Sequence, residues 1–255
     1  MCELLGMSAN VPTDICFSFT GLVKRGGERG PHRDGWGITF YEGKGCRTFK
    51  DALPSSYSPI AKMIQDYPIK SQVIIAHIRQ ANRGGISLEN THPFTRELWG
   101  RYWTFAHNGQ LTDYAQLDTG FFYPVGQTDS EYAFCFLLNQ LYHRYHTMPA
   151  WRELSAEIKK QAAQLAEKGV FNMLLSDGEY IIAYCATHLH WITRKAPFGQ
   201  AKLLDEDIDI DFYQHTTPSD IVTIIATQPL TVNEQWYKIE PGQLVVFRYG
   251  ELICD

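Results

Sequence analysis

Position 2 of this chain is a cysteine that directly follows the initiator methionine. A small side chain there permits removal of Met1, which would give Cys2 a free α-amine. An α-amine has an ordinary pKa of about 7.7–8.0, so near neutral pH it can accept the proton of its own thiol. Cys2 could then act as nucleophile and base together, with no separate catalytic histidine. By itself the position is weak evidence, because any chain can carry a cysteine there by chance.

Asn108 and Gly109 follow a predicted strand over residues 102–107. An oxyanion hole needs hydrogen-bond donors fixed where negative charge develops on an attacked carbonyl, and an Asn amide and a Gly backbone N–H can supply them. Asn-Gly after a strand is also a favoured hairpin turn. On these two residues alone, the turn is the better interpretation.

One cation and one anion stand where each could hold a charged substrate group. Arg79 follows a predicted strand over residues 73–78, and a guanidinium can bind a carboxylate through two parallel hydrogen bonds. Asp129 lies at a predicted helix start, where it could face a substrate ammonium or simply complement the helix dipole. Taken singly, a structural ion pair for Arg79 and the dipole interaction for Asp129 are favoured.

The sequence predicts no metal site and no cofactor. Six scattered cysteines form no C-x-x-C pair, which also argues against a disulfide framework and fits a reducing cytosol. Four histidines match no spacing of metal ligands: His32, His77, His92 and His107. Gly35-Trp-Gly37 and Gly43-Lys-Gly45 fit neither the dinucleotide fingerprint nor the Walker pattern.

Composition is that of an ordinary soluble enzyme. The chain has 255 residues, 44% of them hydrophobic and 20% charged, with a formal net charge of -5. Lys24, Arg25 and Arg29 are interpreted as a solvated loop among glycines, so no nucleic-acid partner is expected. Without a long apolar segment or a signal peptide, we expect no membrane association and a cytoplasmic location.

The order of predicted elements is α+β, in one domain over residues 1–255. The first half is interpreted mainly as strands and loops, with strands over 36–41, 73–78 and 102–107. Thr128-Asp-Ser-Glu131 is a capping box before a helix, and a second helix is predicted over about 151–168 with Gly169 as its stop. Strands follow over 171–175, 180–184, 221–226 and 244–247. This order differs from the strict alternation of a doubly wound sheet.

Several motifs together, in this order, resemble class II glutamine amidotransferases, and most closely their stand-alone bacterial members. The motifs are Cys2, Asp34-Gly-Trp-Gly37, Arg79, Glu89-Asn-Thr-His-Pro93, His107-Asn-Gly109 and Thr128-Asp-Ser-Glu131. The later segments Phe171-Asn-Met-Leu-Leu-Ser-Asp-Gly178 and Ala226-Thr-Gln-Pro-Leu230 are also similar, so the likeness covers nearly the whole chain.

This resemblance implies a fold and a set of roles. The fold is a four-layer αββα sandwich of two antiparallel sheets, as in N-terminal-nucleophile hydrolases. Cys2 would attack the γ-carboxamide of glutamine and form a γ-glutamyl thioester, with Asn108 and Gly109 as the oxyanion hole. Arg79 would hold the substrate α-carboxylate and Asp129 its α-ammonium.

Two segments depart from the family pattern. Many members begin Cys-Gly-Ile, whereas this chain has Cys2-Glu3-Leu4, and many have Trp-Ala-Thr after the arginine, whereas here Gln80-Ala81-Asn82 stands. Asn82 is expected to form an altered wall of the substrate site, and His92 is expected to line the same site. Glutamine and other γ-glutamyl amides therefore both remain open as substrates.

Three interpretations of function remain open. The chain has no room for a synthase domain, so it could supply ammonia to an unseen synthase subunit or act alone on a γ-glutamyl compound. The third interpretation is a non-catalytic module on the same fold that senses glutamine or binds a partner. The presence of nucleophile, oxyanion pair and both substrate clamps argues for an enzyme.

Overall fold

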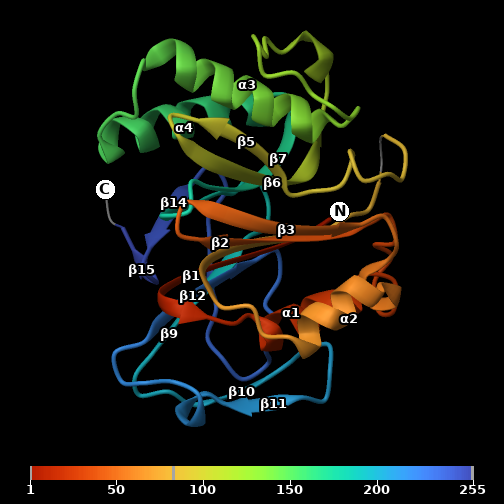
Figure 1. The fold of residues 1–255 in the computed structure, drawn as a ribbon, viewed down its shortest axis with the longest axis vertical. Helices are drawn as coiled ribbons and strands as arrows, with labels where there is room; N and C mark the ends of the chain where they lie inside the picture. The colour runs from red at the N-terminus through yellow and green to blue at the C-terminus, as the bar shows by residue number, and fades with distance from the viewer. Residues whose placement is uncertain (1, 82–83, 254–255) are drawn as a thin grey trace.

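Two antiparallel β-sheets lie face to face between two pairs of helices in the computed structural model, which describes residues 2–81 and 84–253 (Figure 1). The first sheet has the strand order β13 (Tyr237–Lys238), β9 (His190–Lys195), β12 (Ile221–Ala226), β1 (Glu3–Thr13), β4 (Ser71–Ile78), β2 (Trp36–Glu42) and β3 (Gly45–Asp51). The second sheet has the order β15 (Glu251–Leu252), β14 (Leu244–Arg248), β8 (Tyr180–Tyr184), β7 (Gly169–Ser176), β6 (Arg101–Leu111) and β5 (Phe94–Leu98).

Helices cover the outer face of each sheet (Figure 1). Those beside the first sheet are α1 (Cys16–Arg25) and α2 (Pro59–Asp66), and those beside the second are α3 (Asp129–Arg144) and α4 (Trp151–Ala166). The smaller elements are the ribbon of β10 (Gln200–Lys202) and β11 (Asp209–Asp211), and the 3-10 turns Ser55–Tyr57, Tyr114–Gln116 and Phe212–Gln214. Among the helices of the described residues, none is long and apolar enough to cross a bilayer.

Three hydrophobic clusters correspond to the three interfaces between these four layers. Phe19 of α1 packs with residues on the outer face of the first sheet, and Phe134 of α3 packs with those on the outer face of the second. Ile75 and Leu174 belong to the cluster between the sheets. Burial of each large apolar side chain stabilises the fold by about 1.5–3 kcal/mol. The predicted αββα sandwich of two antiparallel sheets is confirmed.

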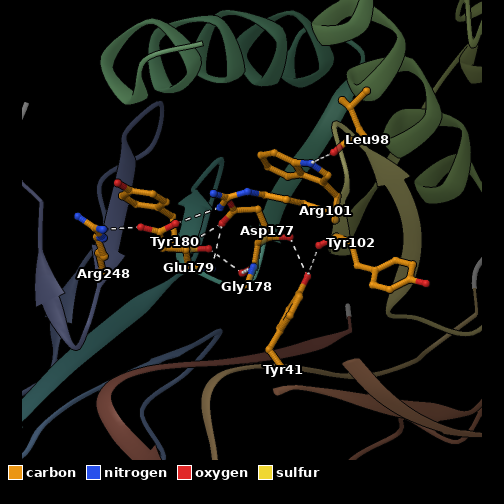
Figure 2. Close-up of polar contacts among 11 residues, drawn as sticks. Tyr41, Leu98, Arg101, Tyr102, Asp177, Gly178, Glu179, Tyr180 and Arg248 are labelled. Atoms are coloured by element: carbon orange, nitrogen blue, oxygen red, sulfur yellow. Dashed lines mark hydrogen bonds and ion pairs between the residues drawn. The ribbon is translucent and has the colours of Figure 1, made fainter. Parts of the chain in front are cut away.

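Tyr41 joins the two sheets at the end of the strands remote from Cys2 (Figure 2). Its side chain extends from β2 to the second sheet, where the hydroxyl lies 2.9 Å from the Tyr102 carbonyl, 2.8 Å from Thr104 Oγ1 and 3.0 Å from the Ser176 carbonyl. Arg101 forms an ion pair at 2.6 Å with Asp177 in the neighbouring turn. The Tyr41 contacts link the two sheets, and the Arg101–Asp177 pair joins β6 to the turn after β7 within the second sheet.

The interpretation of the first half as mainly strands and loops was wrong at two helices, α1 and α2. Arg25, assigned to a solvated loop, lies in the last turn of α1 and is only 7% exposed. Its guanidinium donates to Glu3 at 3.1 Å, to Asp205 at 2.8 Å and to the Pro229 carbonyl at 2.8 Å. Partners remote in sequence therefore stabilise this helix, and local sequence patterns do not contain them.

The two helices of the middle segment were predicted correctly, with differences at their ends. Thr128 accepts a hydrogen bond from the Glu131 amide at 3.2 Å and caps α3. The Glu131 carboxylate does not return to Thr128; it accepts from the Gly126 amide at 2.7 Å. The second helix ends at Ala166, and Gly169, with φ +150, begins β7 instead of ending the helix.

Candidate active site

A small cavity lies at the end of the sandwich where Cys2 precedes β1. Its wall includes five residues that the sequence analysis selected: Cys2, Arg79, His92, Gly109 and Asp129. The cavity opens to solvent, and the empty space within it, mouth included, is about 370 Å³. Asn108 is buried beside it without lining it, and Asn82 lies outside the described residues.

Cys2 is held at the end of β4 by the pairing of β1 with that strand. Glu3 lies opposite Ile78, which places Cys2 beside the segment that follows β4. The Cys2 sulfur accepts a hydrogen bond from the Gln80 amide at 3.3 Å. Burial raises the pKa of the Cys2 thiol, while the Gln80 backbone and Arg79 act in the opposite direction. The thiol therefore needs a nearby base to become a nucleophile at neutral pH.

The motif Asp34-Gly-Trp-Gly37 positions the segment after β4. The Ala81 amide donates to Asp34 Oδ2 at 2.7 Å, and the Arg79 amide donates to the Gly35 carbonyl at 2.8 Å. Gly35 has φ +109, a backbone conformation that residues other than glycine rarely adopt. The motif thus fixes the backbone of residues 79–81, which lie beside Cys2.

Arg79 lies in the wall of the cavity with its guanidinium directed at backbone carbonyls. Nη1 donates to the Gly85 carbonyl at 2.9 Å, and Nη2 donates to the Gly84 carbonyl at 3.4 Å. Burial lowers the pKa of Arg79, and the neighbouring Cys2 and Asp34 raise it. An arginine remains charged in such surroundings, so the cavity has a fixed positive charge in its wall.

Asn108 and Gly109 lie inside β6, which continues to Leu111. The prediction that the strand ends at these residues was therefore wrong, and so was the interpretation of Asn-Gly as a hairpin turn. Gly109 pairs with Phe171 of β7. A Cβ at position 109 would lie 1.7 Å from the Val170 carbonyl oxygen, so only glycine fits there. Asn108 Nδ2 lies 3.4 Å from Thr227 Oγ1, and the Asn108 carbonyl accepts from Asn172 Nδ2 at 3.0 Å.

Asp129 is the first residue of α3 and also contacts the end of β6. Its Oδ2 accepts from the Leu111 amide at 2.7 Å, and its Oδ1 accepts from the Ser130 amide at 3.0 Å. The Ser130 hydroxyl also lies 3.5 Å from Oδ1, so these contacts fix the direction of the carboxylate and leave Oδ2 with a further lone pair. A carboxylate held in this way can accept hydrogen bonds from an ammonium group in the cavity.

Three buried histidines cluster at the cavity: His92 and His107 line it, and His77 packs against His92. The His77 and His92 rings are 4.1 Å apart between centroids. His77 Nε2 lies 3.1 Å from the His107 carbonyl, and His107 Nδ1 lies 2.8 Å from Ser130 Oγ. Burial lowers the pKa of His77 to about 3 and lowers those of His92 and His107 as well. All three rings are therefore neutral near pH 7.

The free energy of unfolding is expected to fall in mild acid because of these rings. Above about pH 6.5 the histidines are neutral in both states and have no effect. Below that pH the histidines become protonated in the unfolded chain but stay neutral in the folded chain. The free energy of unfolding therefore falls by up to ~1.4 kcal/mol per histidine and pH unit, until the pH reaches the pKa of the folded state. Urea unfolding between about pH 7 and about pH 5 measures this slope.

A matched pair of variants separates the buried rings from other titrating groups. His77→Gln should reduce the slope, because one buried imidazole is removed. His143→Gln should leave it unchanged, because His143 is exposed in the last turn of α3. Equal slopes for wild type and His77→Gln would contradict the assignment of the acid sensitivity to this cluster.

Two groups that support the site were not selected from the sequence. Thr227 Oγ1 accepts from the Leu4 amide at 2.9 Å and lies beside Asn108 Nδ2, so it ties the start of β1 to β6. Glu3, the residue after the nucleophile, is 9% exposed and pairs with Arg25. The sequence signal that could have predicted the Glu3–Arg25 pair is an acidic residue at the start of an otherwise mainly apolar strand.

Comparisons with known proteins agree with this geometry. The family model described as class II glutamine amidotransferases matches residues 1–255. YafJ of Escherichia coli (strain K12) is 68% identical over 254 residues, covering 99% of this chain and 100% of YafJ. A 2.0 Å crystal structure of a predicted glutamine amidotransferase from Pseudomonas aeruginosa PA01 is 50% identical, with a TM-score of 0.81 and 100% of both chains covered.

A fourth comparison bears on the fold alone. Glutamine phosphoribosylpyrophosphate amidotransferase from B. subtilis, complexed with ADP and GMP, is 16% identical with a TM-score of 0.63, over 99% of this chain and 48% of that one. The sandwich thus shares its fold with that amidotransferase. With the family match over its full length and the high identity to YafJ, the chain belongs to the class II glutamine amidotransferases.

Proposed function

We propose that this protein hydrolyses glutamine or a related γ-glutamyl amide through a thioester on Cys2. The observation that carries the proposal is the common cavity of a thiol, a guanidinium, a carboxylate and Gly109 in the family's order. We further propose that Met1 is removed, that residues 1–255 act as one domain, and that the protein works in the cytoplasm.

The reaction would begin with transfer of the Cys2 thiol proton to the α-amine. The sulfur attacks the γ-carbonyl carbon, and the resulting oxyanion is stabilised by an Asn108 amide N–H and the Gly109 backbone N–H. An amide nitrogen has two N–H groups, so the contact with Thr227 leaves one for the oxyanion. The C–N bond then breaks, the α-ammonium gives its proton to the leaving nitrogen, and ammonia or an amine departs.

Hydrolysis of the thioester would reverse these roles. The α-amine takes a proton from water, the hydroxide attacks the thioester carbonyl, and the same oxyanion donors stabilise the second tetrahedral intermediate. Collapse breaks the C–S bond, returns the thiol and releases glutamate. The same chemistry serves whether the ammonia leaves to solvent or to a synthase subunit that accepts it.

Arg79 and Asp129 would hold the charged end of the substrate. The carboxylate of the substrate would replace the Gly84 and Gly85 carbonyls as acceptors for Arg79, which requires the segment 84–85 to withdraw. This exchange would also widen the cavity. Asp129, fixed by the Leu111 and Ser130 amides, would accept from the α-ammonium.

Arg79→Lys is expected to raise KM about 10- to 100-fold with a smaller change in kcat, because a lysine cannot form two parallel bonds and a charge-assisted hydrogen bond contributes roughly 1.5–3 kcal/mol. Glutamine titrations in a coupled glutamate assay measure the two constants. Arg152→Lys, at an exposed position of α4, is the control and should behave as wild type. An unchanged KM would remove Arg79 from the clamp.

Release of glutamate with ammonia from glutamine, and of glutamate with the corresponding amine from other γ-glutamyl amides, tests the proposal as a whole. Asparagine, whose side chain is one methylene shorter, serves as the control substrate and should not be cleaved. Tight binding of glutamine without any hydrolysis would instead favour the non-catalytic sensing module.

A further inference from the structure

His92 supplies two buried polar atoms that have no partner. The residue is 3% exposed, and neither Nδ1 nor Nε2 has a hydrogen-bond partner among the residues that the structure describes. Native proteins pair the large majority of their buried polar groups, so an unpaired imidazole needs an explanation. His92 is also one of the residues that line the cavity of Cys2.

Packing alone fixes the position of this ring. The His92 ring centroid lies 4.1 Å from that of His77 and 4.5 Å from that of Phe94. On the backbone side, a Cβ at Gly37 would lie 2.3 Å from the His92 carbonyl oxygen, so β2 and this segment are in close contact. The ring is therefore held without using its nitrogens, which remain available for a ligand.

Burial is the main reason that the His92 ring is neutral. Burial lowers its pKa well below the ordinary value, and His77, His107, Lys50 and Arg79 act in the same direction. A neutral imidazole offers one donor and one acceptor. In the proposed function Arg79 and Asp129 already hold the two charged groups of the substrate. The third polar group of the substrate is the uncharged γ-amide, and a neutral imidazole offers it an uncharged donor and acceptor beside the oxyanion donors.

An amide and a carboxylate differ in how they match such a pair. An uncharged amide has both N–H donors and a carbonyl acceptor, so it can satisfy either nitrogen of a neutral imidazole. A carboxylate has only acceptors, and burying its charge against an uncharged group is strongly unfavourable. The ring can therefore distinguish the γ-amide of the substrate from the γ-carboxylate of the product.

We propose that His92 is a specificity-determining residue, whose imidazole hydrogen-bonds the γ-amide of the substrate and so favours γ-glutamyl amides over glutamate. This inference rests on the proposed function, because it assumes that the cavity holds a γ-glutamyl group. Its consequence is that the product binds more weakly than the substrate and leaves the site readily.

Calorimetric titration of Cys2→Ala protein tests the inference, because binding can then be measured without turnover. The quantity of interest is the ratio of the glutamate Kd to the glutamine Kd. His92→Phe keeps the ring contacts with His77 and Phe94 but removes both nitrogens, and it should lower this ratio about tenfold, the effect of one hydrogen bond. His92→Gln keeps a neutral donor and acceptor and should largely preserve the ratio.

Two further measurements make the test decisive. His143→Phe, on the exposed end of α3, is the control and should leave the ratio unchanged. If His92→Phe does not fold, as judged by its melting curve, His92→Leu replaces it. A folded variant without the nitrogens but with the parental ratio would overturn the inference, as would equal affinity of the Cys2→Ala protein for glutamine and glutamate.

Failure of the proposed function gives a different pattern. A wild-type protein that binds glutamine with a ratio dependent on His92, but never cleaves any γ-glutamyl amide, would contradict the catalytic proposal and support the role of His92. If the wild-type protein cleaves glutamine normally but the ratio of the glutamate Kd to the glutamine Kd does not change on substitution of His92, only the role of His92 is contradicted.

Discussion

Cys2→Ala protein is expected to show no detectable amide hydrolysis while unfolding at nearly the wild-type urea concentration. The thiol is the nucleophile in the proposed mechanism, and among the described residues that line the cavity no other carries a thiol. The folding effect should be small, because Cys2 is only half-buried and its sulfur makes a single weak contact pair with Gln80. Release of glutamate and urea unfolding give the two readouts.

Cys46→Ala is the matched control for this variant. Cys46 is also half-buried but lies in β3, away from the cavity. It should retain wild-type turnover and similar stability. Unchanged hydrolysis in the Cys2→Ala protein would contradict the mechanism, because a thioester could not then be an intermediate.

Asn108→Ala is expected to lower kcat by about 10²–10³ with a smaller change in KM, which is the usual effect of removing one oxyanion donor. The donor acts on charge that exists only in the transition state, so binding of the ground state should change less. Steady-state kinetics with glutamine separate the two constants. The variant also removes the contact with Thr227, so its free energy of unfolding must be measured alongside.

Asn139→Ala controls for the loss of a buried amide in general. Asn139 is fully buried in α3 and donates to the Asp118 carbonyl at 3.1 Å. We expect it to lose stability and to keep its kcat. If Asn108→Ala also loses only stability, Asn108 has a structural role in β6 and no role in the chemistry.

The sequence predicted those parts of the fold that depend on local patterns. The cap at Thr128, the apolar period of α3 and the hairpin between β7 and β8 are each determined by neighbouring residues. The four-layer arrangement came from the resemblance, since the local patterns alone indicated only α+β. The hydrophobic clusters between the layers are consistent with both.

The parts that were missed depend on contacts remote in sequence. α1 contains glycine and threonine, which are poor helix formers, and its end is stabilised by Arg25 with Glu3 and Asp205. The hairpin signal at Gly109 was misleading because the glycine is required by the close approach of Val170. These positions are determined by tertiary packing, which no local window of the sequence contains.

The candidate site shows the same division. Cys2, Arg79, His92, Gly109 and Asp129 could be selected from residue type and order, and the cavity brings them together. The supporting hydrogen bonds of Asp34 and Thr227 could not, because each joins strands far apart in the chain. Residue types thus indicated the chemistry, and the structure was needed for the groups that position it.

The intact mass of the purified protein, before and after incubation with a glutamine-mimicking diazoketone, tests the central claim most directly. The account predicts that Met1 is absent and that one adduct forms on Cys2 and is missing from the Cys2→Ala protein. Peptide mapping assigns the adduct to its residue. Retention of Met1 with no adduct would contradict the account and indicate a non-catalytic module on this fold.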